Sequence, residues 1–158
     1  MLDLKEVEIL QVALAHEEQA RAFYVRMADR HDDSTARDLF LFLSREEEGH
    51  ILRLTSRYGI QEFEKKWEEK FLPYLIDLDR LAGEEVLGTQ STTGPEAVRR
   101  SLGIARKAES HAIAFYAGAG KTVEDKKTKT LLAELEEEER NHLAKIDGYL
   151  ADLPPAPR

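Results

Sequence analysis

HEEQARAFY, at residues 16–24, lines up with AESHAIAFY at residues 108–116 when the chain is shifted by 92 positions. In the first stretch Glu17 stands seven residues before the tyrosine of a Phe-Tyr pair, and in the second Glu109 stands at the same distance before the tyrosine of another. A repeat at a fixed offset is a strong indicator of architecture. The two stretches therefore predict a chain built from two similar halves.

Each half continues with a second matching motif. Glu47-x-x-His50 follows Glu17 at the same distance at which Glu139-x-x-His142 follows Glu109. A single Glu-x-x-His on a helix is usually part of a solvated face, and the acidic run at residues 136–139 invites the same interpretation. Here the motif occurs twice at the same offset, and each copy follows a matching glutamate at the same distance. This agreement favours a shared function instead.

Composition narrows the classes of protein that the chain fits. Its 158 residues suit one domain, 34% of them are charged, the net charge is -8, and cysteine is absent. These values exclude a disulfide scaffold, a thiolate zinc site and an iron–sulfur cluster, and they argue against nucleic acid or an anionic membrane as partner. The sequence contains neither a signal-peptide pattern nor a long apolar run, so we expect a cytoplasmic protein.

Hydrophobic periodicity predicts an all-α fold. Four amphipathic stretches, at about residues 3–30, 34–59, 94–120 and 125–150, carry apolar residues at helical spacing, and no segment alternates with strand period. Short polar turns pair them into two antiparallel hairpins. We expect one four-helix-bundle domain over residues 1–152 and a flexible proline-rich tail at 153–158.

A connection of about 35 residues, 60–94, joins the predicted hairpins. Residues 62–81 have apolar positions at helical spacing, but Pro73 should kink or split that element, and residues 83–94 resemble a loop. A long crossover of this kind joins hairpins in some four-helix bundles. The periodicity equally allows a segment that covers the bundle or forms a subunit contact.

Six polar residues lie on the apolar stripes of the four predicted helices: Glu17, Glu47, His50, Glu109, Glu139 and His142. Four carboxylates in a bundle interior would repel one another and lose hydration. Two divalent cations would neutralise them, and residues at i and i+3 share a helix face, so each Glu-x-x-His can serve one site. A donor set of oxygen and nitrogen without sulfur fits iron and manganese.

Tyr24 and Tyr116 lie two turns beyond Glu17 and Glu109 on the same faces. Their hydroxyls either donate hydrogen bonds to ligand carboxylates or belong to packing aromatics that reach solvent. His16, His31 and His111 have no counterparts in register, so we expect ordinary surface or boundary histidines. The glutamates beside the two motifs, at 46, 48, 137 and 138, are predicted to point away from the ligand seam.

At these residues the sequence resembles the rubrerythrin-like branch of the ferritin-like di-iron carboxylate proteins. The matching pieces are residues 15–24, 47–50, 108–116 and 139–142, within about residues 5–58 and 95–150. The resemblance implies a ferritin-like four-helix bundle, an oxo-bridged centre of two iron ions, a homodimer, and reaction with hydrogen peroxide or dioxygen. Manganese fits the same ligands.

Two departures from that family concern the reaction. Typical rubrerythrins carry a rubredoxin domain with four cysteines, whereas this chain has none, so a separate rubredoxin-like protein or flavoprotein would supply electrons. The extra carboxylate of typical members, one turn from the helix-three ligand, has no counterpart near Glu109. We therefore expect an oxidoreductase that reduces a small oxidant. The alternatives are a ferroxidase for iron storage, and a metal-free bundle that binds a partner through residues 62–81.

Overall fold

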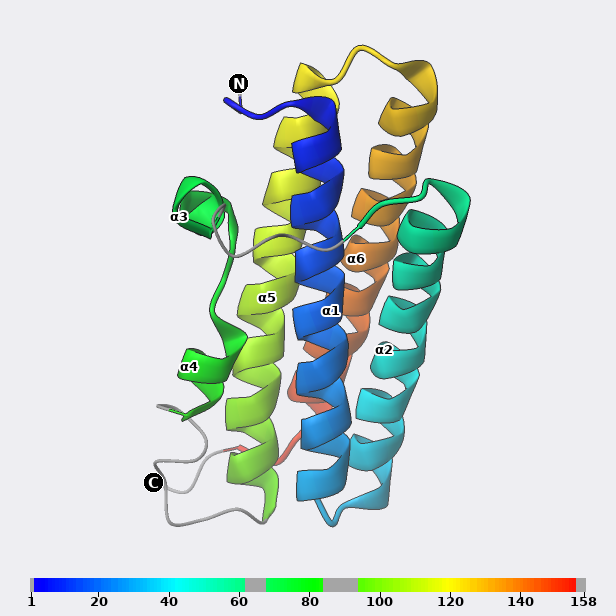
Figure 1. The fold of residues 1–158 in the computed structure, drawn as a ribbon. Coiled ribbons are helices and arrows are strands. Elements are labelled where there is room, and N and C mark those ends of the chain that lie inside the picture. The colour runs from blue at the N-terminus through cyan, green and yellow to red at the C-terminus, as the bar shows by residue number, and fades with distance from the viewer. Residues whose placement is uncertain (1, 62–67, 84–93, 156–158) are drawn as a thin grey trace.

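Four long helices form the protein in the computed structural model, which describes residues 2–61, 68–83 and 94–155. α1 (Glu6–Arg30) and α2 (Ser34–Leu52) make the first antiparallel hairpin, and α5 (Gly94–Thr122) and α6 (Lys126–Asp152) make the second (Figure 1). The described residues contain no strand. The predicted all-α, ferritin-like four-helix bundle is confirmed.

Equivalent aspartates begin the second helix of each hairpin. Asp33 accepts a hydrogen bond from the Ala36 amide at 2.8 Å, and Asp125 accepts one from the Thr128 amide at 2.8 Å. These side chains satisfy amide groups that have no partner inside the helix. The turn predicted near residues 120–125 is shorter than expected, because α5 continues to Thr122.

The predicted second helix changes its hydrogen bonding before it ends. Regular α-helix stops at Leu52, and one π-helical turn, η1 (Arg53–Arg57), continues it. Gly59 follows with φ of 65°, a left-handed conformation that glycine adopts without steric cost. The helical prediction to about residue 59 is therefore correct in extent, although the last turn is wider than an α-helix.

The connection between the hairpins is broken into short pieces. It contains α3 (Glu68–Phe71), a 3-10 turn η3 (Leu72–Tyr74) that includes Pro73, and α4 (Leu78–Ala82). The predicted break at Pro73 is confirmed. The helical prediction for residues 62–67 and the loop prediction for 84–93 fall outside the described residues.

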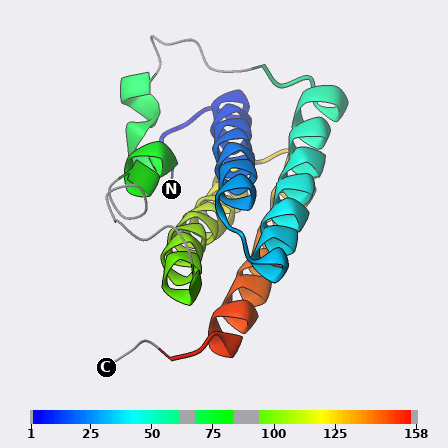
Figure 2. The same cartoon turned by 90° about the horizontal axis from the view of Figure 1, so that it is seen from below.

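This connection covers one face of the bundle. In Figure 2, α3 and α4 lie beside α1 and α5, on the side away from α2 and α6. Phe71, Leu78 and Ala82 are buried there, at 0–2% exposure. Burial of this apolar surface fixes the connection to the face formed by α1 and α5.

Two apolar clusters fill the bundle, one toward each end. One includes Phe23, Phe40 and Leu102, and the other includes Leu14, Leu54 and Leu135. A layer of buried polar side chains lies between them. Among the described residues, no helix combines the length and the apolarity needed to span a membrane.

Candidate metal centre

The six residues predicted from the repeat meet in this middle layer. α1 supplies Glu17 and α5 supplies Glu109, while α2 and α6 supply the two Glu-x-x-His pairs. None of the six is more than 2% exposed. The stripes of the four helices therefore place every predicted site residue in one buried cluster.

The cluster divides into two overlapping groups. Glu17, Glu47, His50 and Glu139 each offer one atom within 4.8 Å of the others, and so do Glu47, Glu109, Glu139 and His142. Glu47 and Glu139 belong to both groups. Two carboxylates that belong to both groups could supply ligand atoms to two ions at once.

Both imidazoles turn their Nδ1 atoms toward the carboxylates. His50 Nδ1 lies 3.0 Å from Glu17 Oε2, 3.1 Å from Glu139 Oε1 and 3.3 Å from Glu47 Oε2. His142 Nδ1 lies 3.0 Å from Glu139 Oε2 and 3.1 Å from Glu47 Oε1. The nitrogen that would bind an ion is therefore Nδ1 in both histidines.

Burial and mutual repulsion perturb the acidity of the cluster. Burial and the charge of Glu17 raise the pKa of Glu47 well above its usual range, and the same causes act on the pKa of Glu139. Burial opposes a charged imidazole, but the surrounding carboxylates raise the pKa of His50 and the pKa of His142 far above the usual range. Without cations, protons must neutralise this layer.

The donor set fits a metal site. Both carboxylate oxygens of Glu47 are buried, and their contacts with the two histidine Nδ1 atoms, at 3.1 and 3.3 Å, lack hydrogen-bond geometry. Unpaired buried acceptors are costly, and a cation would satisfy them. Four carboxylates also balance the charge of two divalent ions, and the absence of sulfur suits iron or manganese.

Each tyrosine predicted beside the site reaches across to the opposite hairpin. The Tyr24 hydroxyl donates to Glu109 Oε1, and the Tyr116 hydroxyl donates to Glu17 Oε1. Both rings are at most 1% exposed. The alternative, in which these hydroxyls reach solvent, is therefore wrong, and the two contacts orient the glutamates of α1 and α5.

Comparison with known proteins agrees with this geometry. The Rubrerythrin family model matches residues 8–150, which includes all four long helices apart from their outermost turns. The chain belongs to the rubrerythrin family. No curated protein matches it.

Two solved structures share the fold of this rubrerythrin-family protein. A DUF305 fragment from Deinococcus radiodurans is 20% identical, with a TM-score of 0.74 and coverage of 94% of this chain and 96% of its own. A hypothetical protein from Pyrococcus furiosus is 22% identical, with a TM-score of 0.67 and coverage of 96% and 91%. At these identities the likeness concerns the fold alone.

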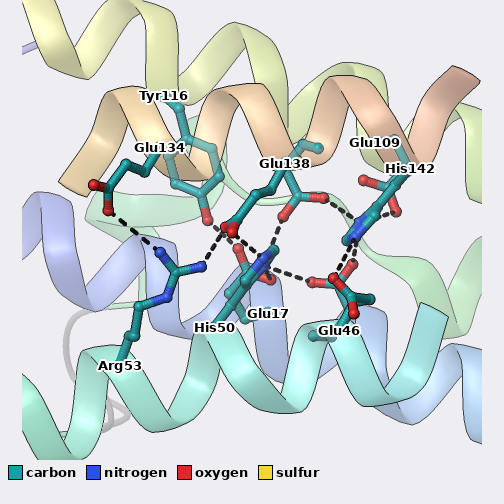
Figure 3. A network of polar contacts seen from close by, with 11 residues as sticks. Glu17, Glu46, His50, Arg53, Glu109, Tyr116, Glu134, Glu138 and His142 are labelled. Carbon is teal, nitrogen blue, oxygen red and sulfur yellow. Dashed lines mark hydrogen bonds and ion pairs between the residues drawn. The ribbon is translucent and has the colours of Figure 1, made fainter. Parts of the chain in front are cut away.

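Two further glutamates contact the histidines of this rubrerythrin-family site from outside. His50 Nε2 lies 3.0 Å from Glu138 Oε2, and His142 Nε2 lies 3.8 Å from Glu46 Oε2 (Figure 3). Arg53 pairs with Glu138 and with Glu134 on the same side. The sequence prediction placed both glutamates away from the seam and missed their contacts, although the offset of 92 also relates Glu46 to Glu138.

The histidines set aside as ordinary in the sequence are not alike in the structure. His16 is only 5% exposed and His31 only 1%, so their assignment to the surface or its boundary is wrong. His31 shares a 2.8 Å hydrogen bond with Ser101 Oγ, which makes its burial tolerable. Burial, with a smaller effect of His111, lowers the pKa of His16 to about 4.

Proposed function

We propose that this rubrerythrin-family protein is a dinuclear metal oxidoreductase that reduces hydrogen peroxide or dioxygen with electrons from a separate donor protein. One observation carries the proposal: two buried groups of ligand atoms share Glu47 and Glu139. A buried charge cluster of this kind is costly for stability alone, so a chemical function is the stronger explanation for it.

The residues of the chain would hold the pair of ions in a defined place. Glu17 and His50 complete one group, and Glu109 and His142 complete the other, around the two shared carboxylates. The tyrosine hydroxyls and the surrounding apolar clusters fix the ligand rotamers and limit access by water. Iron is our preferred metal, and manganese is the alternative that these ligands accept.

Redox-active ions in this place would exchange electrons with a small oxidant and act as Lewis acids toward it. The described residues supply no cysteine and no second cofactor cluster that would deliver electrons. The proposal therefore includes a rubredoxin-like protein or a flavoprotein as reductant. It needs no protein nucleophile.

Metal counting and rapid mixing test the proposal together. Protein reconstituted anaerobically with Fe(II) should bind two ions per chain, one for each group, and its oxidised form should have the absorption of a bridged di-iron pair. Stopped-flow mixing of the reduced protein should then oxidise the iron with either peroxide or dioxygen. A chain that binds no iron and no manganese contradicts the proposal.

The same experiment separates reduction of an oxidant from iron storage. If each chain keeps oxidising further Fe(II) and retains it as a large ferric deposit, the ferroxidase interpretation is correct. If turnover stops after one oxidation until a reductant protein is added, the oxidoreductase interpretation is correct.

A further inference from the structure

His16 is a buried histidine outside the predicted ligand set. It directly precedes Glu17 on α1 and is 5% exposed. Its Nε2 atom is buried and has no hydrogen-bond partner among the described residues. A buried polar atom without a partner costs stability, and in native structures it calls for an explanation.

A small cavity gives that explanation. Its volume is about 10 Å³, near the lower limit for one water molecule. The four glutamates of the metal centre line it, together with His16, three alanines of α1 and α5, and two apolar residues of the connection, Ile76 and Leu78. His16 is thus the polar lining residue that is not itself a predicted metal ligand.

Neighbouring side chains hold the His16 ring in place. Its centroid lies 5.0 Å from that of His111 and 5.4 Å from that of Phe115, both on α5. His111 Nε2 lies 2.8 Å from the Tyr74 carbonyl oxygen, which can only accept a hydrogen bond, so His111 donates. The connection and α5 therefore fix the imidazole beside the cavity before any ligand enters.

The internal repeat shows that the metal ligands do not require a histidine here. Position 108, the equivalent of 16 at offset 92, is alanine and also lines the cavity. One half of the repeat therefore supplies a hydrogen-bonding group to the cavity and the other half does not. This asymmetry indicates a role for His16 beyond charge balance.

We propose that His16 Nε2 is the hydrogen-bond partner of a small oxygen- or nitrogen-donor ligand, of the class of peroxide, dioxygen or azide, that enters between α1, α5 and the connection. The inference rests on the proposed function, because it assigns the position of the oxidant at that same site. A ring nitrogen of histidine can donate or accept one hydrogen bond, which suits a peroxide oxygen that carries a proton.

Azide binding to the iron-loaded, oxidised protein tests the proposal. The probe is azide itself, titrated by visible absorption, with iron content measured on each sample. His16→Gln and His16→Met have similar lengths, but only glutamine keeps an N–H group near the position of Nε2. Loss of one hydrogen bond should weaken azide binding about tenfold in His16→Met, whereas His16→Gln should stay within about threefold of the wild type.

Two controls isolate the hydrogen bond from folding and metal content. His16→Ala, which opens the cavity, should behave like His16→Met, and His31→Val, a substitution of a buried histidine elsewhere, should leave azide affinity unchanged. All variants should retain wild-type iron content.

Three results with the variants would overturn the proposal. They are equal azide affinity in His16→Met and wild type, an equal loss in His16→Met and His16→Gln, or loss of iron from both variants. Wild-type protein that binds iron but no azide would overturn it too. Failure of the wild type to bind metal at all is a different result, which removes the proposed function itself.

Discussion

The hairpin of α1 and α2 and the hairpin of α5 and α6 agree most closely at the centre of the bundle. Each contributes one glutamate, one Glu-x-x-His pair and one tyrosine, and each tyrosine donates to the glutamate of the other hairpin. Each also begins its second helix on an aspartate cap. The residues that hold charge in the interior are the ones that match.

The hairpins differ around that centre. His16 faces the cavity where the second hairpin has Ala108, and a buried His31 in the first turn corresponds to Val123 in the second. Arg53 pairs with Glu138 beside His50, whereas its counterpart Lys145 lies over the Phe42 ring, 4.8 Å from the centroid. Charge balance constrains the inner layer in both halves, while the outer contacts have become specialised.

Removal of a shared carboxylate should have the largest effect. Glu47→Ala should reduce iron from two ions per chain to nearly none, because Glu47 serves both groups. Glu17→Ala should leave one ion, since Glu17 belongs to a single group. Iron analysis after anaerobic loading measures both, with the exposed Glu48→Ala as control. Equal losses in Glu17→Ala and Glu47→Ala would contradict the division into two groups.

Removal of either tyrosine hydroxyl should lower the stability of the protein by the same amount. Tyr24→Phe or Tyr116→Phe removes the donor to a buried carboxylate, which should lower the free energy of unfolding by about 1–3 kcal/mol. Urea denaturation of the metal-free protein measures this. Tyr149→Phe is the control, because its contact with Asp33 is exposed and should be worth less than about 0.5 kcal/mol. A clear inequality between Tyr24→Phe and Tyr116→Phe would show that the symmetry of the inner layer is only apparent.

Substitution of the two glutamates that contact the histidines from outside should weaken metal binding by different amounts. Glu138→Gln should weaken metal binding about tenfold. This is the low end of the effects seen when a residue that contacts a metal-bound histidine is changed, because Glu138 is 38% exposed. Glu46→Gln should change metal binding less than about threefold, since its contact with His142 is 3.8 Å long. Competition with a chelator measures both affinities. The reverse order would refute the asymmetry between the two histidines.

The turn of the first hairpin should make the free energy of unfolding depend on pH, and the turn of the second should not. This is the smallest of the expected effects. Burial lowers the pKa of His31, so below about pH 6.5 the unfolded chain binds this proton more readily than the native chain. The contribution of neutral His31 to stability is therefore complete above that pH and decreases as the pH falls.

His31→Val copies the second turn and should remove this dependence. The stability of the wild type relative to His31→Val should fall by at most about 1.4 kcal/mol per pH unit between pH 6.5 and 5. Thermal unfolding of the metal-free proteins at several pH values measures the difference. Parallel pH profiles for the two proteins would show that His31 is not protonated on unfolding in this range.

The sequence predicted the inner layer because both of its signals are periodic. The helical stripes place Glu17 and His142 inward, and the offset of 92 identifies their equivalents, so the bundle and the six residues could be predicted together. The same logic predicted the break at Pro73, which is a local property of proline.

The outer layer could not be predicted from periodicity. The Glu138 side chain is partly exposed, and the contact of its carboxylate with His50 depends on how α6 packs against α2. The burial of His16 depends on the connection, whose path over α1 and α5 no repeat specifies. The π-helical turn after Leu52 has no periodic signal in the sequence either.

The cross-hairpin contacts of the tyrosines have a consequence for the origin and design of this architecture. Each hairpin contains half of the donor set, and its tyrosine completes the other half instead of its own. Two identical copies of the α5–α6 hairpin would therefore contain four carboxylates, two imidazoles and both tyrosine donors in matching positions. A single gene segment for one hairpin, duplicated and joined by a linker, would encode every residue type of the centre.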